Sequence, residues 1–257
     1  MDLVEVPGAP FRRHPWEVAR ARFFERVVEA ARRGSGPCRV LDVGAGAGYL
    51  GRLLLQRLPP GSRVECFDPH YTDEDLRRFS DPPTPGLSFV RARPAGAVDV
   101  VLLLDVIEHV ADDRAFLAEN LDASVAADTA VLVSVPAWNQ LYSQHDVELR
   151  HFRRYSPRQC RALLESGGLE IVRSGGLFHS LLVPRIAARV GEAVAELTGR
   201  LHRRKPKNIG QWRGGRVVTR VLEAALAADN RVSDLAARAG RELPGLSYWA
   251  LCRRAAR

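Results

Sequence analysis

The residues most suggestive of chemistry form a glycine loop with a carboxylate just before it. Asp42 lies inside a short apolar run, two residues before Gly44, and Gly46 and Gly48 follow at alternate positions. Glycines let the backbone approach a bound molecule closely. A pyrophosphate binds amide groups at a helix N-terminus and gains nothing from a nearby carboxylate. This carboxylate therefore suits a nucleoside that carries an ammonium or sulfonium group, such as S-adenosyl-L-methionine, although a tight structural turn would also use such glycines.

Two further carboxylates end later apolar runs. Asp68 ends the next run, where a carboxylate can accept hydrogen bonds from both hydroxyls of a ribose. A helix cap is the structural alternative for Asp68. Asp105 follows the most apolar run of the chain, and Glu108 and His109 come three and four residues later. We expect Asp105 and His109 to flank the same ligand.

A polar cluster follows the fifth apolar run. It contains His145, Asp146, His151, Arg153, Arg154 and Tyr155. A histidine here could take a proton near neutral pH, and Asp146 could orient it. Arg154 could bind an acidic group of a substrate. The alternative is a loop in which these polar side chains only hold one another.

Apolar runs and helical patterns alternate along the first part of the chain. This order predicts a parallel sheet with helices on both faces, and ligands bind at the carboxyl ends of its strands. The glycine loop, Asp68, Asp105 and the polar cluster should therefore surround one opening. The predicted strands span 40–43, 64–67, 87–90, 98–104 and 130–135, and the predicted helices between them span 49–58 and 111–121.

The rest of the chain is predicted to be mainly helical. Helices are expected over 9–33, 157–166, 181–201 and 217–239, a long polar loop over 137–156, and strands over 169–172 and 246–251. We divide the chain into an N-terminal helical segment (1–36) and one domain (37–257), with 181–240 as a helical insertion before the last strand. The apolar face that begins at 181–189 is expected to pack in the core, with a lipophilic acceptor pocket or a homodimer contact as alternatives.

With these residues in view, the chain resembles the class I S-adenosylmethionine-dependent methyltransferase superfamily, in particular its type 11 and type 12 members. The matching segments are Leu41-Asp-Val-Gly-Ala-Gly-Ala-Gly48, Leu104-Asp-Val-Ile-Glu-His-Val110, and the polar stretch from Val135 to Asp146 with 151–156. The resemblance implies an α/β fold, a Rossmann-like doubly wound seven-stranded and mostly parallel sheet whose antiparallel last strand lies beside the sixth. It also implies S-adenosyl-L-methionine as the cofactor.

The site residues follow from the motifs and the resemblance together. Predicted cofactor-binding residues are Asp42, Gly44, Ala45, Gly46, Gly48, Asp68, Pro69, Asp105, Val106 and His109. Predicted catalytic residues are His145, Asp146, His151 and Tyr155, and predicted substrate-binding residues are Trp138 and Arg154. Methyl transfer from a sulfonium mainly needs alignment and sometimes proton removal, so we expect no metal, although Asp105, Glu108 and His109 could hold a divalent ion.

Composition bears on partners and location. The net charge is +8, but the arginines are scattered along predicted helices, so we expect a solvated basic face and no nucleic-acid partner. We expect a cytoplasmic protein, because the cysteines show no paired spacing and the sequence has no secretory leader. It also has no apolar run long enough to span a membrane. We expect O- or N-methylation of a natural-product or lipid-like small molecule. The alternatives are an RNA methyltransferase, an NAD(P)-dependent oxidoreductase and a non-catalytic adenosylmethionine binder.

Overall fold

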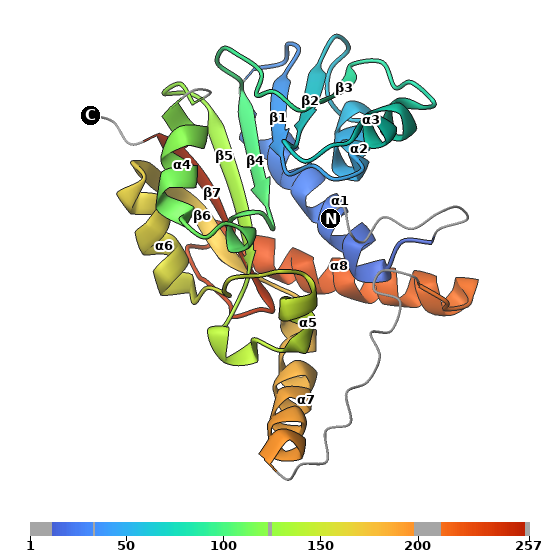
Figure 1. The fold of residues 1–257 in the computed structure, drawn as a ribbon, viewed down its shortest axis with the longest axis vertical. Coiled ribbons are helices and arrows are strands. Elements are labelled where there is room, and N and C mark those ends of the chain that lie inside the picture. The colour runs from blue at the N-terminus through green and yellow to red at the C-terminus, as the bar shows by residue number, and fades with distance from the viewer. Residues whose placement is uncertain (1–11, 33, 123–124, 198–211, 255–257) are drawn as a thin grey trace.

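Seven strands form one sheet in the order β3-β2-β1-β4-β5-β7-β6 (Figure 1). The structure is a computed structural model and describes residues 12–32, 34–122, 125–197 and 212–254. The strands are β1 (Arg39–Val43), β2 (Arg63–Phe67), β3 (Leu87–Val90), β4 (Val100–Leu104), β5 (Ala130–Pro136), β6 (Leu169–Leu177) and β7 (Ser247–Arg254).

The first five strands pair in parallel, and β7 lies between β5 and β6, antiparallel to both. This arrangement confirms the predicted fold, including the position of the last strand. β1 and β4 are buried on both faces, which explains their continuous apolar sequence. The paired ends of β1 and β4, Val43 and Leu103, bring the glycine loop beside Asp105.

Helices cover both faces of the sheet. The α-helices of the described residues are α1 (Pro15–Ala31), α2 (Tyr49–Leu55), α3 (Asp73–Ser80), α4 (Asp113–Asp122), α5 (Gln144–Glu148), α6 (Pro157–Ser166), α7 (His179–Leu197) and α8 (Arg216–Arg238). Alternate strand residues point to opposite faces. One set, including Val40 and Leu102, packs with α1, α2 and α8, and the other, including Leu41 and Leu103, packs with α4 and α6.

Helix α1 packs into the same core as the sheet. His14 and Glu17 form a capping box at its start, and its buried face includes Phe23 and Phe24. The Phe23 ring meets that of Trp249 on β7 edge to face, with 5.0 Å between centroids. The N-terminal helix is therefore in contact with the last strand of the chain.

Several elements differ from their predicted extents. α1 begins at Pro15 and α2 ends at Leu55, while β6 continues to Leu177. α3 was not predicted, although Thr72 and Asp75 form its capping box, and α5 lies inside the predicted polar loop. Residues 198–201, the end of the predicted helix over 181–201, lie outside the described residues.

The expected core packing of the apolar face of α7 is wrong. Val183, Ile186 and Val190 are 72%, 45% and 58% exposed, because the helix projects from the body of the protein (Figure 1). All four cysteines are buried and free. Among the described residues, no helix combines the length and hydropathy needed to cross a membrane.

Candidate cofactor and acceptor site

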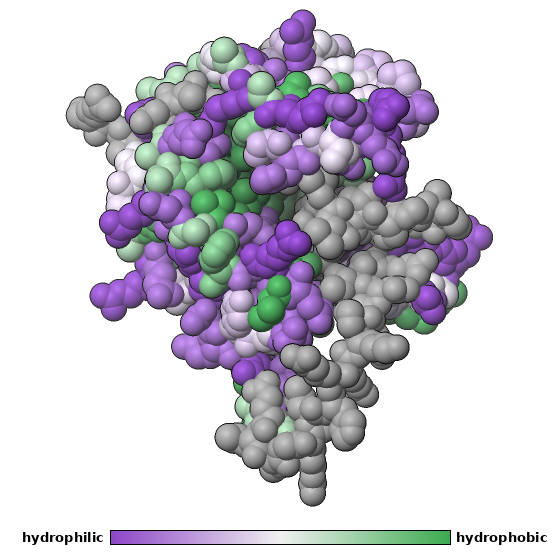
Figure 2. Space-filling model, viewed as in Figure 1, coloured by the Kyte–Doolittle hydropathy of each residue, from purple (hydrophilic) through white to green (hydrophobic). Residues whose placement is uncertain are grey.

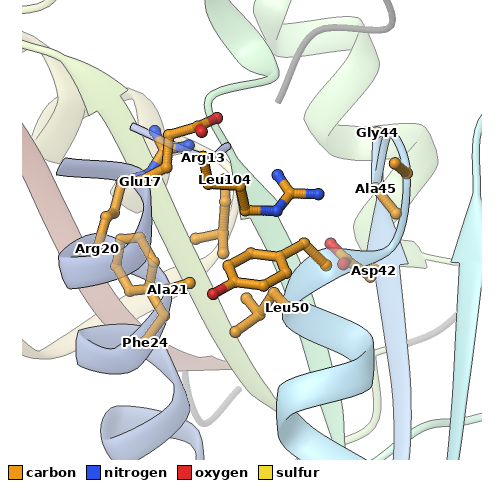
Figure 3. A pocket seen from close by; sticks show the side chains of 12 residues that line it. Arg13, Glu17, Arg20, Ala21, Phe24, Asp42, Gly44, Ala45, Leu50 and Leu104 are labelled. Atoms are coloured by element: carbon orange, nitrogen blue, oxygen red, sulfur yellow. The ribbon is translucent and has the colours of Figure 1, made fainter. Parts of the chain in front are cut away.

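A cleft of about 560 Å³, open to solvent, lies at the carboxyl ends of β1 and β4. Its walls are α1 on one side and the glycine loop with the start of α2 on the other (Figure 3). Figure 2 shows that this face of the molecule is hollowed, with apolar residues inside and hydrophilic residues around them. The cleft is lined by Arg13, Glu17, Arg20, Ala21, Phe24, Asp42, Gly44, Ala45, Ala47, Tyr49, Leu50 and Leu104.

Asp42 reaches this cleft from the interior of β1. Its side chain is 5% exposed and accepts no hydrogen bond from the described residues. Burial raises the pKa of Asp42 to about 7. A buried carboxylate without a partner is costly, so this position favours a ligand that brings a positive charge or a hydrogen-bond donor.

The glycine loop has the backbone that its glycines allow. Gly44, Gly46 and Gly48 all have positive φ angles, of 67°, 54° and 66°. A Cβ atom on Gly44 would lie 2.8 Å from Cγ2 of Val106, so the loop packs directly against the segment after β4. The buried hydroxyl of Tyr71 donates a 2.6 Å hydrogen bond to the Gly46 carbonyl and holds the loop in place.

Asp68 lies beside this loop. The amide of Gly44 donates to the carbonyl of Phe67, the residue before Asp68, at 2.8 Å. Asp68 is 9% exposed, and its Oδ1 accepts the amide hydrogen of His70 at 2.9 Å. One carboxylate oxygen thus shapes the turn, as a cap would. Pro69 in this turn is exposed.

Asp105 is held in a left-handed backbone conformation, with φ of 55°. Its Oδ1 accepts a 2.7 Å hydrogen bond from the Ser134 hydroxyl on β5, and its carboxylate pairs with Arg20 of α1. The guanidinium of Arg20 also lies 4.8 Å from the centre of the Trp16 ring. These contacts join α1, β4 and β5 at the back of the cleft.

Glu108, His109 and His151 meet next to this point. Glu108 and His109 lie on a short 3-10 turn, η2 (Ile107–His109), after β4. The rings of His109 and His151 pack edge to face with 4.6 Å between centroids. Glu108 is fully buried, which raises its pKa to about 8. The structure therefore brings the predicted cofactor residue His109 against the predicted catalytic residue His151.

Asp146 organises the polar cluster. It is fully buried and accepts hydrogen bonds from Nδ1 of His151 at 2.9 Å, Nε of Arg154 at 2.7 Å and the amide of Ser143 at 2.9 Å. Burial acts to raise the pKa of Asp146, but the His151 hydrogen bond and the Arg154 charge hold it well below its usual range. Asp146 and Arg154 thus hold each other and orient His151.

The other predicted acceptor-side residues lie apart from this group. Tyr155 is buried, and its hydroxyl donates to Asp113 at 2.8 Å. His145 is exposed and lines a separate hollow with Arg185 of α7. Nε1 of Trp138 donates to the Gly245 carbonyl at 2.8 Å, beside another cavity.

Three residues of the candidate site were not among the predicted site residues. Arg20 lines the cleft and pairs with Asp105, Tyr71 holds the glycine loop, and the carboxylate of Glu108 has no partner among the described residues. Tyr71 and Arg20 lie far in sequence from the groups they contact, so spacing gave no signal for them. Glu108 was visible only as one member of a motif.

Comparison with known proteins identifies the family. A profile described as a methyltransferase domain matches residues 11–174. The chain belongs to this methyltransferase domain family. The matched residues include those of the cleft, the glycine loop and the polar cluster. The match begins within the N-terminal segment, so α1 is part of the family domain.

One curated relative is a "Probable S-adenosylmethionine-dependent methyltransferase" from Mycolicibacterium smegmatis, 30% identical over 105 residues. The match covers 40% of this chain and 40% of the relative's length. The family and this relative imply S-adenosyl-L-methionine as the cofactor, as predicted. Asp42 and the glycine loop fit that cofactor, because the buried carboxylate of Asp42 faces a cleft where an ammonium group can bind.

Solved structures share the fold at low sequence identity. A putative methyltransferase in a Haloferax volcanii complex with the Trm112 activator aligns with a TM-score of 0.53 and 15% identity, over 94% of this chain and 95% of that one. The [4+2]-cyclase SpnF aligns with a TM-score of 0.52 and 13% identity, over 92% and 81%. These proteins differ in what they do, so the shared fold alone does not define the reaction.

Proposed function

We propose that this protein transfers a methyl group from S-adenosyl-L-methionine to an oxygen or nitrogen atom of a small-molecule acceptor in the cytoplasm. The observation that carries the proposal is Asp42, a buried carboxylate with no hydrogen-bond partner among the described residues, facing a cleft bounded by a left-handed glycine loop. The cofactor supplies an activated methyl group. The chain has to bind it, align the acceptor and remove a proton where one is present.

The cleft residues divide the task of binding. Asp42 binds the ammonium group, and the glycine backbone leaves room for the ligand. Asp68, directly after β2, accepts hydrogen bonds from the ribose. Asp105, held by Arg20 and Ser134, fixes the wall between the cofactor and the acceptor.

His151 is the predicted catalytic residue best placed to act on an acceptor. Its ring contacts His109, which follows β4, and Asp146 fixes its orientation. Asp146 itself is buried, and the hydroxyl of Tyr155 is hydrogen-bonded to Asp113. Neither side chain therefore reaches an acceptor in this arrangement. His145 lies on the exposed side of α5.

The test is to incubate the protein with methyl-labelled cofactor and metabolite extracts, and to measure both a methylated product and S-adenosylhomocysteine. We expect His151→Ala to lower kcat by about 100-fold or more, with S-adenosylhomocysteine affinity changed by less than about threefold. His145→Ala should have a much smaller effect. A protein that binds the cofactor but consumes none with any fraction would be a binder and not an enzyme.

An RNA acceptor is the second candidate, supported by the net charge of +8. If basic side chains bind RNA by neutralising its phosphates, the affinity for RNA would fall by orders of magnitude when the salt concentration rises from 50 to 200 mM. We expect turnover of the true acceptor to change by less than about threefold over that range. A steep loss, together with methylated RNA in the extract, would favour the RNA reaction.

A further inference from the structure

The buried carboxyl group of Glu108 receives no hydrogen bond from any other residue that the structure describes. Its side chain is fully buried, and neither oxygen has a partner on another described residue. A protonated carboxyl would leave its O–H unpaired, and an ionised one would leave a whole charge unpaired, so both forms are costly here. Such an isolated group in a packed interior calls for a water or an ion beside it.

Two imidazoles face the same point. Ligand atoms of Glu108, His109 and His151 all lie within 4.8 Å of one another. Nδ1 of His151 is 2.9 Å from Oδ1 of Asp146, whose ionised carboxylate can only accept. His151 therefore carries its proton on Nδ1 and presents a lone pair on Nε2. A carboxylate that orients a histidine in this way is the usual support of a metal-binding imidazole.

The two arginines nearest to the cluster are paired with other carboxylates. Arg20 pairs with Asp105, and Arg154 pairs with Asp146. Glu108 is in an ion pair with neither arginine, although both are close enough to lower its pKa slightly against the effect of burial. A cation between Glu108 and the histidines would bind the ionised form of this carboxyl group and neutralise its charge.

We propose that Glu108, His109 and His151 bind one divalent first-row transition-metal ion of the zinc type. One carboxylate with two imidazoles matches catalytic sites for such ions, whereas Mg²⁺ and Ca²⁺ prefer oxygen ligands alone. Asp105, which the sequence suggested as a third ligand, is instead held by Arg20 and Ser134. The proposal replaces our sequence-based expectation of a metal-free site.

The position of this cluster gives the ion a role in acceptor binding. Three protein ligands leave a coordination position open. Arg20, which lines the cofactor cleft, lies near enough to Glu108 to act on its charge. An acceptor oxygen at the open position would be held beside the cleft, and the pKa of its hydroxyl would fall. This role rests on the proposed function and makes His151 a ligand of the ion and not a proton acceptor. The binding of the ion itself does not depend on that function.

The test is a Co²⁺ titration of the tag-free, full-length protein, followed by visible absorption, with Zn²⁺ affinity measured by competition. We expect saturable d–d bands at one equivalent, which Zn²⁺ displaces and a chelator removes. Glu108→Gln and His151→Ala should each weaken Zn²⁺ affinity by about 100-fold or more. His145→Ala, on the same polar loop, is the matched control and should keep wild-type affinity.

Featureless Co²⁺ spectra of the wild-type protein would overturn the proposal, and this readout needs no variant to fold. Equal Zn²⁺ affinity in the wild type, Glu108→Gln and His151→Ala would also overturn it. S-adenosylhomocysteine binding, measured on the same samples, separates the two proposals. Metal binding without cofactor binding would contradict the proposed function alone, and cofactor binding without metal binding would contradict the metal site alone.

Discussion

At the residue scale, the carboxylates of the site differ in whether a positively charged side chain is paired with them. Asp146 and Asp105 are buried or half-buried, and each is paired with an arginine. Asp42 is buried and unpaired among the described residues, and its pKa rises to about 7. The unliganded protein therefore holds a carboxylate that is poorly solvated and suited to a cationic ligand.

This arrangement predicts a cost in stability that depends on pH. The folded pKa of Asp42, about 7, is above its unfolded value of 3.8. The contribution of the protonated Asp42 carboxyl group to the unfolding free energy is therefore fully present below pH 3.8 and is lost as pH rises through 7. Relative to Asp42→Asn, the unliganded wild type should lose on the order of 2 kcal/mol of unfolding free energy between pH 5 and pH 8. Urea denaturation at the two pH values checks this, and parallel curves for the two proteins would contradict it.

At the element scale, the site forms where the loop after β1 packs against the segment after β4. Gly44 and Val106 come from separate motifs in the sequence, and they touch because β1 and β4 pair in parallel. We expect Gly44→Ala to weaken S-adenosylhomocysteine binding by about tenfold or more, since the new Cβ meets Val106 and a positive φ disfavours any side chain.

Two variants separate the steric effect from the backbone effect. Val106→Ala in the Gly44→Ala background should restore part of the affinity, because it removes the contacting methyl groups. Gly168→Ala is the matched control, since Gly168 has a φ of 77° with no atom within 4 Å of an added Cβ. It should cost about 1 kcal/mol of stability without changing affinity. Equal losses of affinity in Gly44→Ala and Gly168→Ala would show that loop packing is not the cause.

The sequence predicted the strands and the glycine loop well, because continuous apolar runs mark buried parallel strands. The position of β7 came from the family resemblance, since pairing between distant strands leaves no local pattern. α3 was missed because this short segment is acidic and arginine-rich, and its large apolar side chains are only Leu76 and Phe79. The pairing of Arg20 with Asp105 and the isolation of Glu108 depend on tertiary packing, so residue spacing alone could not reveal them.

At the scale of the whole molecule, helix α1, which lies in the predicted N-terminal helical segment (1–36), forms one core with the sheet. Phe23 is 1% exposed and packs against Trp249, whose Nε1 donates to the Ser233 hydroxyl of α8 at 3.1 Å. The indole ring of Trp249 thus connects α1, β7 and α8. The cofactor cleft, which α1 lines, should therefore form only when the whole core has folded.

We expect Phe23→Ala to lower the unfolding free energy by about 3–5 kcal/mol while unfolding stays a single transition. Phe152→Ala, at a ring that is 59% exposed, is the control and should change stability by less than about 0.5 kcal/mol. Tryptophan fluorescence and far-UV circular dichroism should give coincident urea curves. An early separate transition would show instead that α1 folds as an appended segment.

The most direct test of the central claim is calorimetric titration with S-adenosylhomocysteine at pH 8 and pH 6, on the wild type and Asp42→Asn. With a carboxylate pKa of about 7, the wild-type Kd should rise about tenfold from pH 8 to pH 6. Asp42→Asn should bind about 10-fold or more weakly at pH 8 and show no such dependence. Wild-type affinity in the variant, or the same pH dependence in both proteins, would contradict the assignment of Asp42 to the cofactor.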